Sequence, residues 1–243
     1  MKIGFLSDAH GNPEGLANCM SVLARKGATR LYFLGDAVGY LPRWTEVLEL
    51  LRSHEVTCLR GNHDERVLHF VLKESSTDTY QLLPSYLESI RPYVEWMASW
   101  PNSVSVAVDG LSLMLMHASP EDSLNGYVYP WTDMSSIAWP KADAIGMGHT
   151  HRPFARFHED HLLFNPGSCG LPRDIGHLAS CGLLDTRDRS VTIYRVPFSV
   201  ERVLADSRFI HPEVRKCLGR LPVQYEGQLV DIPQKHALRG CQP

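Results

Sequence analysis

The chain has 243 residues, of which 44% are hydrophobic and 21% charged, an ordinary globular composition with enough apolar residues for a sizeable core. Its formal net charge of -3 and its pI near 6.4 lack the basic character that binding to extended nucleic acid or to anionic membranes requires. No apolar run approaches the roughly 18 residues of a membrane span, and no leader-like segment precedes the first strand. We therefore expect a cytoplasmic protein without membrane or extended nucleic-acid partners.

The cysteines form no Cys-x-x-Cys pair, and most of them lie in apolar segments. This pattern indicates reduced core residues, not a disulfide framework or a zinc-thiolate site. The six are Cys19, Cys58, Cys169, Cys181, Cys217 and Cys241.

The first segments alternate between strand and helix. Residues 2–7 predict a buried strand, after which Asn12 and Pro13 supply an N-cap and a first-turn proline. The helix that follows ends at Gly27. Its expected apolar face consists of Leu16, Met20, Leu23 and Ala24.

The same alternation continues to about residue 100. Residues 30–36 and 55–62 predict two more strands, so strand-helix-strand order implies parallel pairing with right-handed crossovers. The helix between them is marked by Trp44, Val47, Leu48 and Leu51. From about residue 66 the pattern is helical, with core contacts expected from Tyr86, Ile90, Val94 and Met97.

The second half is rich in short strands. Residues 103–108 and 111–117 predict a hairpin, because Asp109-Gly110 suits a type I′ turn. Further strands are expected at 143–148, 154–158, 161–165, 178–185 and 190–196. We expect an α/β fold with two mixed sheets packed face to face and helices outside. Residues 1–206 should form one domain, and 207–243, with one helix at 212–219, an extension packed on it.

Polar side chains follow five of these strands. They are Asp8, His10 and Asn12; Asp36; Asn62, His63 and Asp64; His117; and His149 and His151. Loops beyond the carboxyl ends of strands in open α/β sheets meet in one crevice, so these groups should converge. A single Asp-x-His or Gly-Asp is common in turns, whereas five such ends in order predict a metal site.

The combination of Asp8-Ala-His10, Gly35-Asp36, Gly61-Asn62-His63-Asp64, His117 and Gly148-His149-Thr150-His151 resembles the calcineurin-like metallophosphoesterases. Within them it is similar to the small single-domain bacterial and archaeal phosphoesterases, over residues 1 to about 200. The resemblance implies a four-layer α/β/β/α sandwich. It also implies that Asp8, His10 and His151 bind one metal ion, that Asn62, His117 and His149 bind another, and that Asp36 bridges the two.

The ligand types limit the metal and suggest the substrate. No cysteine joins the cluster, so two divalent ions of Mn, Fe, Zn, Ni or Co suit it. Two such ions, Asp8, Asp36 and a bridging hydroxide leave a net positive charge, which would attract an anionic phosphoryl group to a slightly acidic protein. Ions about 4 Å apart can activate a shared water and stabilise in-line displacement. The resemblance thus implies hydrolysis of a phosphate ester by a metal-bridging hydroxide.

Residues outside the ligand set have alternative roles. His63 is the expected catalytic group, donating a proton to the leaving group, and its alternative is support of a ligand. Asp64 is expected to cap a helix, with orientation of an imidazole as the alternative. Asn12 and Arg173 are candidates for substrate binding; a helix cap and a turn with a surface ion pair are their alternatives. His54, His69, His158, His161, His177, His211 and His236 are expected at the surface or in packing.

One departure from related enzymes bears on the substrate. In the phosphoprotein phosphatases of this superfamily, an aspartate that orients the catalytic histidine and a phosphate-binding arginine follow the Gly-Asp motif. Gly39 and Tyr40 stand in their places here, which argues against a dedicated protein phosphatase. The next residues, 41–43, also differ from those of close relatives, so the rim of the site should differ.

We expect a phosphodiesterase, with a phosphomonoesterase or protein-phosphatase-like enzyme and a non-catalytic scaffold as alternatives. The diester is preferred because a protonating His63 assists a poor alkoxide leaving group and few basic residues mark a pocket for a dianion. The substrate should be a small phosphate ester, with nucleotides among the candidates. Aromatic residues at 80–100 and 127–139 are expected to pack in the core or an interface, and a nucleotide pocket is the alternative. The sequence leaves the physiological substrate, native metal and oligomeric state open.

Overall fold

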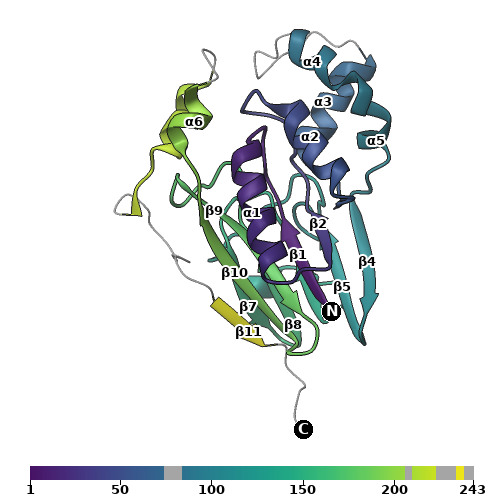
Figure 1. Ribbon diagram of the computed structural model, residues 1–243. Helices are drawn as coiled ribbons and strands as arrows, with labels where there is room; N and C mark the ends of the chain where they lie inside the picture. The colour runs from purple at the N-terminus through teal and green to yellow at the C-terminus, as the bar shows by residue number, and fades with distance from the viewer. Residues whose placement is uncertain (74–83, 206–209, 223–233, 238–243) are drawn as a thin grey trace.

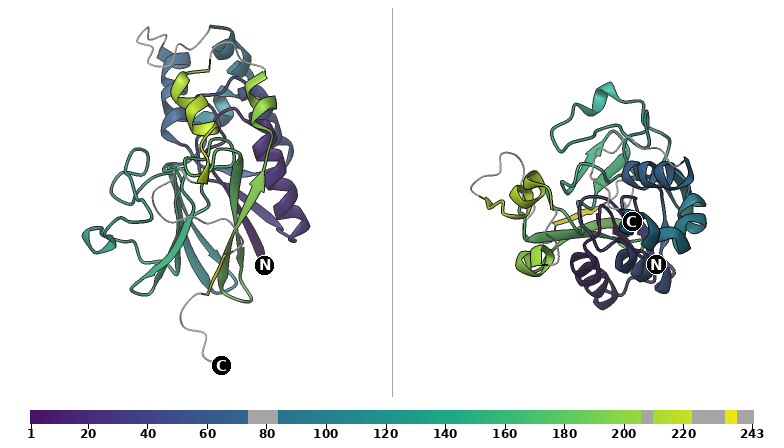
Figure 2. Two further views of the ribbon diagram at one scale, coloured as in Figure 1. Left: turned by 90° about the vertical axis from the view of Figure 1, so that its left-hand side faces the viewer. Right: turned by 90° about the horizontal axis from the view of Figure 1, so that it is seen from above.

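The computed structural model describes residues 1–73, 84–205, 210–222 and 234–237, and within them two mixed sheets pack face to face (Figures 1 and 2). One sheet has the strand order β11-β10-β9-β1-β2-β3 and the other β4-β5-β6-β8-β7. The strands are β1 (Lys2–Leu6), β2 (Arg30–Phe33), β3 (Thr57–Cys58), β4 (Ser103–Val108), β5 (Leu111–Met116), β6 (Ala144–Gly146), β7 (Phe154–His158), β8 (His161–Asn165), β9 (Leu178–Asp185), β10 (Ser190–Pro197) and β11 (Gln234–Ala237).

Helices are concentrated beside the first sheet and at one end of the molecule (Figure 1). They are α1 (Pro13–Arg25), α2 (Trp44–Ser53), α3 (Asn62–Lys73), α4 (Pro84–Ile90), α5 (Val94–Ala98), α6 (Val200–Ala205) and α7 (Pro212–Leu218), with 3-10 turns η1 (Arg91–Tyr93) and η2 (Met134–Ser136). Among the described residues, no helix has the length and apolar character needed to span a membrane.

The parallel pairing expected for the first three strands is confirmed. Phe5 of β1 lies opposite Tyr32 of β2, and Tyr32 lies opposite Thr57 of β3, in parallel register. On the other side of β1, strand β9 runs antiparallel. Because β1, β2 and β3 run in the same direction, the loops that follow them leave the sheet at the same edge.

Helix α1 begins and ends as its residues predict, with one exception on its apolar face. Asn12 caps it, Pro13 occupies the first turn, and the helix ends just before Gly27, which has a φ of 83°. Ala24 was expected to be buried, but it is exposed, and Cys19 is buried instead. Ala24 lies at the edge of the apolar stripe, whereas Cys19 lies between the buried positions on its axis.

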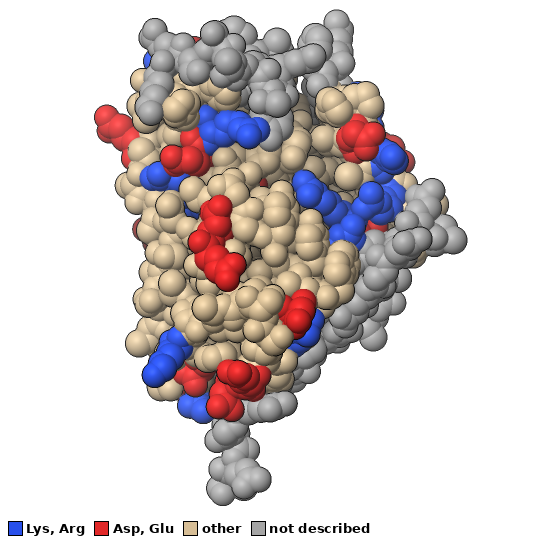
Figure 3. Space-filling model, turned by 180° about the vertical axis from the view of Figure 1, so that it is seen from behind, with Lys and Arg blue, Asp and Glu red and all other residues tan. Residues whose placement is uncertain are grey.

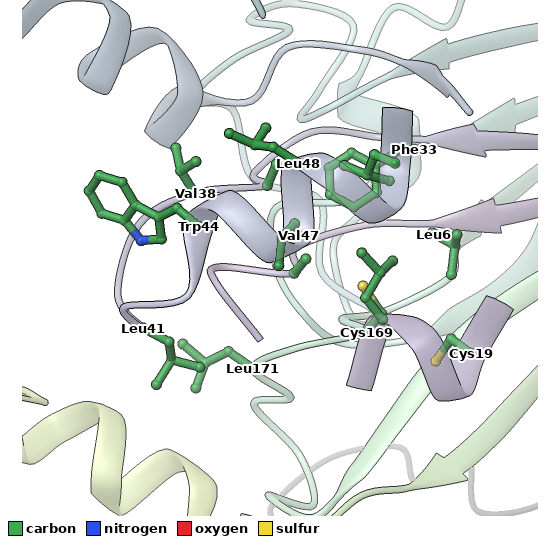
Figure 4. Close-up of a cluster of buried hydrophobic side chains, with 14 of the residues drawn as sticks. Leu6, Cys19, Phe33, Val38, Leu41, Trp44, Val47, Leu48, Cys169 and Leu171 are labelled. Atoms are coloured by element: carbon green, nitrogen blue, oxygen red, sulfur yellow. The ribbon is translucent and has the colours of Figure 1, made fainter. Parts of the chain in front are cut away.

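Apolar side chains from alternate strand positions build two separate layers of core. Leu6 and Phe33 point toward the helices, where they join Val47, Leu48 and Cys169 in one buried cluster (Figure 4). Phe5, the neighbour of Leu6, faces the other sheet, and its ring centroid lies 4.8 Å from that of Phe164. This division follows from the two-residue period of a strand. It fixes the sheets against each other and therefore fixes the loops at their ends.

The second sheet matches the expected strands and the expected hairpin. Asp109 and Gly110 have φ angles of 47° and 77°, and both central residues of a type I′ turn require positive values. The outer face of this sheet is covered by residues 118–143, a long loop whose helical part is the short turn η2. Val128 and Met134 of this loop pack on Met116, Ile145 and Phe154. The predicted class, two mixed sheets flanked by helices, is confirmed, with this loop as the covering layer here.

The described part of the tail contacts the rest of the chain. The helix predicted at 212–219 is α7, whose Val214 and Leu218 join the same buried cluster as Val203. Strand β11 pairs antiparallel with β10. The domain boundary at residue 206 stays a prediction. Five cysteines are unpaired, as expected, and Cys241 lies outside the described residues.

Candidate metal centre

The expected site residues lie together where loops from both sheets meet. Asp8 follows β1, Asp36 follows β2, and His63 lies in the first turn of α3. His117 follows β5, and the loop after β6 carries His149 and His151. Three groups of side chains have potential ligand atoms within 4.8 Å of one another: Asp8, His10 and His151; His10, Asp36 and His63; and Asp36, His117 and His149. Contacts between segments over 100 residues apart thus create the site.

Each of the two central carboxylates holds a neighbouring loop with one oxygen and leaves the other facing the imidazoles. Asp8 Oδ2 accepts a hydrogen bond from the His149 backbone N–H at 3.1 Å, while Asp8 Oδ1 lies 3.4 Å from His151 Nε2. Asp36 Oδ1 accepts from the His63 backbone N–H at 2.8 Å. Asp36 Oδ2 lies 3.6 Å from His10 Nε2 and 3.4 Å from His117 Nε2. This oxygen is therefore placed between the two groups of imidazoles, where a bridging ligand would lie.

Three imidazoles are oriented by backbone carbonyls. The Nδ1 atoms of His10, His117 and His151 lie 3.1, 2.6 and 2.6 Å from the carbonyl oxygens of Val38, Leu34 and Leu171 respectively. A carbonyl only accepts, so each Nδ1 carries the proton. In a neutral ring, Nε2 is then an unprotonated acceptor that faces the centre, as metal binding requires.

Two close contacts between acceptors show that the centre is built around positive charge. The Nε2 atoms of His10 and His151 are 3.0 Å apart, and His117 Nε2 lies 3.2 Å from Asn62 Oδ1. With Nδ1 protonated and the rings neutral, the lone pairs of His10 and His151 Nε2 would face each other and repel. His117 Nε2 faces the Asn62 oxygen without repulsion only when it carries a proton or a cation lies between them. A cation or a proton between each pair removes the repulsion. The two contacts fall on the two halves of the centre.

The pKa values of the buried groups also indicate that the centre requires cations. Burial on its own would lower the pKa of His117, but Asp36 outweighs it and raises that pKa to about 9. Burial raises the pKa of Asp8 to about 7. In addition, Asp8 Oδ1 and His149 Nε2 are buried and have no hydrogen-bond partner. Metal cations would satisfy both atoms and keep the carboxylates ionised, so the donor set fits divalent metal ions.

Strained backbone positions the same residues. Five candidate ligands have φ angles in the left-handed region, which residues other than glycine rarely adopt. The angles are 55° at Asp8, 47° at His10, 63° at Asp36, 65° at His149 and 57° at His151. Each such residue costs on the order of 1–3 kcal/mol. Hydrogen bonds across the loops hold this conformation, among them Asp8 N–H to Gly35 O and His10 N–H to Asp36 O. Strain concentrated on five candidate ligands indicates that the backbone is shaped for the site.

His63 lies at the more open side of the centre. It and His149 are each 6% exposed, and Asn62 is half-buried, whereas His10 and His117 are fully buried. His63 Nε2 is 4.0 Å from Asp36 Oδ2. Burial lowers the pKa of His63, and Asp36 opposes this effect. The ring is therefore placed beside the expected ligands and is slightly more exposed than His10 and His117.

Gly39 and Tyr40 pack against the His63 ring. A Cβ on Gly39 would lie 2.7 Å from His63 Nδ1, so only glycine allows the chain to pass this close, and its φ of 113° also favours glycine. The Tyr40 ring centroid lies 4.6 Å from that of His63 and 4.8 Å from that of His10. Van der Waals contacts with Gly39 and Tyr40 thus limit the positions of the His63 ring. In protein phosphatases an aspartate orients the corresponding histidine.

Asp64 has a role that the sequence did not predict. Its carboxylate accepts hydrogen bonds from the backbone N–H groups of Asp36, Ala37, Val38 and Gly61, at 2.7 to 3.3 Å. The bond from Gly61, at the start of α3, is of the capping type, but the others tie α3 to the loop after β2. Burial raises the pKa of Asp64 to about 7, and these N–H groups oppose the shift. Asp64 therefore holds the loop that carries Asp36.

Replacing Asp64 with alanine is expected to lower the free energy of unfolding by about 3 kcal/mol or more, because several buried N–H groups lose their acceptor. Urea unfolding followed by circular dichroism measures this. Glu65→Ala, one residue along the same helix, removes an exposed carboxylate that pairs with Arg60, and should cost at most about 1 kcal/mol. Equal effects of the two variants would mean that the carboxylate does not hold the loop.

The two candidates for substrate binding differ in the structure. Asn12 is 1% exposed, its Oδ1 accepts from Gly15 N–H, and its Nδ2 donates to Gly170 O. It caps α1 and leaves no exposed group for a substrate. Arg173 is half-buried. Burial lowers the pKa values of His10, His63, His149 and His151, and the charge of Arg173 lowers them further. The ion pair suggested for Arg173 is formed instead by Asp174 with Arg195, at 2.6 and 2.9 Å.

Two residues that the sequence reasoning gave little weight support the ligands directly. Ser168 Oγ donates to Asp8 O at 2.7 Å and accepts from Leu171 N–H. Asn165 Nδ2 donates to Gly148 O and to Thr150 Oγ1, within the loop that carries His149 and His151. The signal available in the sequence is the Asn165-Pro-Gly-Ser168 motif directly after β8, which fits a family loop and an ordinary turn equally well.

Comparison with known proteins gives a consistent result. The calcineurin-like phosphoesterase superfamily domain matches residues 1–189. An uncharacterized protein of Methanocaldococcus jannaschii is 28% identical over 222 residues, which cover 82% of this chain and 89% of that protein. The phosphodiesterase YfcE of Escherichia coli is 27% identical over 201 residues, covering 79% and 91%.

Solved structures show the same fold. A metallophosphoesterase from Sphaerobacter thermophilus superposes with a TM-score of 0.71 at 24% identity, covering 90% of this chain and 98% of that one. A hypothetical protein from Pyrococcus horikoshii gives a TM-score of 0.76 at 19% identity, covering 90% and 97%.

Proposed function

Because this chain belongs to the calcineurin-like phosphoesterase superfamily, we propose that it is a dinuclear metal-dependent phosphodiesterase. The observation that carries the proposal is the position of Asp36 Oδ2, which lies within 3.6 Å of an imidazole nitrogen in each half of the centre. One shared carboxylate oxygen between two sets of donors is the arrangement that a pair of ions requires.

The proposed ligands divide between two ions. Asp8, His10 and His151 hold one ion, and Asn62, His117 and His149 hold the other, with Asp36 shared between them. When bound, the two ions activate a water molecule for attack on phosphorus and neutralise the phosphoryl oxygens. Nitrogen and oxygen donors without thiolate suit Mn, Fe, Zn, Ni or Co, and we propose Mn²⁺ as the first ion to test.

His63 supplies the remaining chemistry. It lies beside the shared carboxylate, with Nε2 4.0 Å from Asp36 Oδ2, where its ring would reach the leaving-group oxygen of an ester bound at the metal centre. Because burial lowers the pKa of His63 in the free protein, the anionic substrate supplies the charge that favours a protonated ring. The protonated ring then donates to the departing alkoxide, which is the group that most needs a proton. Arg173, whose charge acts on several of these imidazoles, adds a cation that attracts the phosphate.

A diester is preferred over a phosphoprotein for two reasons. Gly39 and Tyr40 replace the aspartate and arginine with which protein phosphatases orient their histidine and bind a phosphate dianion, and the similar Escherichia coli protein is named a phosphodiesterase. A small ester substrate also suits this centre, because all of its expected residues are buried except Asn62, which is half-buried. We place the protein in the cytoplasm, on the ground that its described thiols are unpaired.

The test is removal and return of the metal. Chelator-treated protein should be inactive, and Mn²⁺ should restore hydrolysis of bis(p-nitrophenyl) phosphate at a kcat/KM at least about tenfold above that for p-nitrophenyl phosphate. The melting temperature should rise with metal, because a ligand that binds the folded state stabilises it. A faster monoester reaction would favour the phosphomonoesterase alternative. Protein that binds two metal equivalents yet hydrolyses neither ester would favour the scaffold.

A further inference from the structure

A row of aromatic residues leads away from the candidate metal centre along the loop that covers the second sheet. In the loop stretch 127–131, Val128 packs on the second sheet and Pro130 is also buried, while the aromatic residues between and beside them are more exposed. They are Tyr127, Tyr129 and Trp131, and the first and last are 53% and 56% exposed. Burial alternates along this stretch, and the three aromatic rings lie together in one row.

The three rings form a stepped stack. The ring centroids of Tyr127 and Tyr129 are 5.7 Å apart with planes 9° apart, and those of Tyr129 and Trp131 are 5.1 Å apart with planes 4° apart. Nearly parallel rings at these separations are offset and overlap only in part. Each ring therefore keeps part of its face in solvent, and another flat ring can stack on the row.

Both ends of the row contact the loop that follows β6, which carries His149 and Arg152. The Tyr127 ring centroid lies 4.4 Å from that of His149, a proposed metal ligand. At the other end, the Arg152 guanidinium lies over the Trp131 ring, 5.4 Å from its centroid. An ester group of a phosphate bound at the centre would thus meet Tyr127 first, with Tyr129 and Trp131 beyond it.

Packing does not account for this arrangement. The sequence favoured a core or interface role for the aromatic residues at 127–139, and this is correct for Trp139, which packs with the cluster of Met134. The expected core role is wrong for Tyr127 and Trp131, because both residues are more than half exposed. Figure 3 views the molecule from the side of this loop, and the middle of that face carries few Lys, Arg, Asp or Glu side chains. Large exposed aromatic rings beside a reactive centre indicate a binding surface.

We propose that Tyr127, Tyr129 and Trp131 form a stacking row for the nucleobase of a nucleotide phosphodiester whose phosphate binds at the metal centre. The proposal rests on the proposed phosphodiesterase function and names its substrate class. The flat faces of the row favour a planar ring as the ligand. Because Tyr127 contacts His149, a base stacked on Tyr127 would lie next to the phosphate. The Arg152 guanidinium at Trp131 suits an anionic ligand. Aromatic faces stack on every base, so the row selects nucleotides in general rather than one base.

Two diesters with the same leaving group test this. We compare thymidine 5′-(p-nitrophenyl phosphate) with methyl p-nitrophenyl phosphate, both with Mn²⁺-loaded protein. The wild type should prefer the nucleoside ester in kcat/KM, and Tyr127→Ala or Trp131→Ala should reduce that preference about tenfold. Tyr127→Phe, which keeps the ring, should retain it. Trp96→Ala on α5, which removes an aromatic ring outside the site, is the control and should retain it too.

A binding measurement separates the row from the function. A non-hydrolysable nucleoside 5′-phosphonate should quench tryptophan fluorescence of the Mn²⁺-loaded protein at concentrations where methylphosphonate does not, and Trp131→Phe should remove most of the quench. Hydrolysis of the methyl ester with no nucleoside preference would overturn the row and leave the function intact. Hydrolysis of neither ester would overturn the function, and the phosphonate titration would then decide the row by itself. Equal losses on both esters in Tyr127→Ala would mean that Tyr127 only supports His149.

Discussion

Replacing Asp36 with asparagine is expected to lower kcat/KM for bis(p-nitrophenyl) phosphate about a thousandfold or more and to remove at least half of the bound metal. Asp36 Oδ2 is the oxygen placed between His10 and His117, so its loss affects both halves of the centre. Burial disfavours the ionised Asp36, but the nearby imidazoles of His117 and His63 outweigh it and hold its pKa well below the usual value. The carboxylate is therefore charged at every pH of interest, and the amide removes a full negative charge.

Metal content by plasma mass spectrometry and steady-state kinetics measure the two effects on the same preparation. Asp160→Asn makes the same chemical change in the exposed turn between β7 and β8, and should alter neither. The Asp36 variant should still fold, because asparagine keeps an oxygen that can accept from the His63 N–H. Full metal content together with wild-type turnover in Asp36→Asn would contradict the shared site.

Replacing His63 with asparagine is expected to lower kcat about 10²- to 10³-fold while metal content stays near that of the wild type. The loss should be greater for a diester with an alkyl leaving group than for one that releases p-nitrophenolate, because p-nitrophenolate departs without a proton. This dependence on the leaving group distinguishes a proton donor from a residue that only supports the ligands.

The experiment is needed because His63 also satisfies the geometry of a ligand: its nitrogen lies within 4.8 Å of a His10 nitrogen and of an Asp36 carboxylate oxygen. Loss of metal in parallel with activity would assign His63 to the metal. A uniform loss on both leaving groups with full metal content would assign it to positioning. His54→Asn, a change at an exposed histidine just after α2 and outside the candidate centre, serves as the control.

Local signals explain why so much of the fold was predictable. Short apolar runs and alternating patterns predicted a strand at each position from β1 to β10, and helical spacing predicted α1 and α2, because these periods are set by backbone geometry. The strand predicted at 55–62 is too long, since β3 covers only Thr57–Cys58 and Asn62 begins α3. Asp109-Gly110 predicted its turn, because both residues had to adopt positive φ. The error at Ala24 arose at the edge of an apolar stripe, where neighbouring helices decide what is covered.

The site was predictable to the level of residue types and no further. Polar residues after five strands indicated where a centre would form, since parallel strands end at the same edge of a sheet. The sequence could not show which oxygen of Asp8 or Asp36 faces the imidazoles, because a backbone N–H from a distant loop takes the other one. It also could not show that Asp64 holds the loop after β2, since backbone donors leave no mark in a sequence.

By itself, the sequence determined the order of strands and helices, the set of carboxylates and imidazoles, and the strand ends on which they lie, because each depends on residues close together in the chain. Tertiary structure decided which imidazole nitrogen faces the centre, since carbonyls of Val38, Leu34 and Leu171 select it from 20 to 83 residues away. It also decided that the Tyr127 ring stays in solvent beside His149, since Val128 packs on the second sheet and Tyr127 does not. Such contacts depend on distances between segments that only the folded chain brings together.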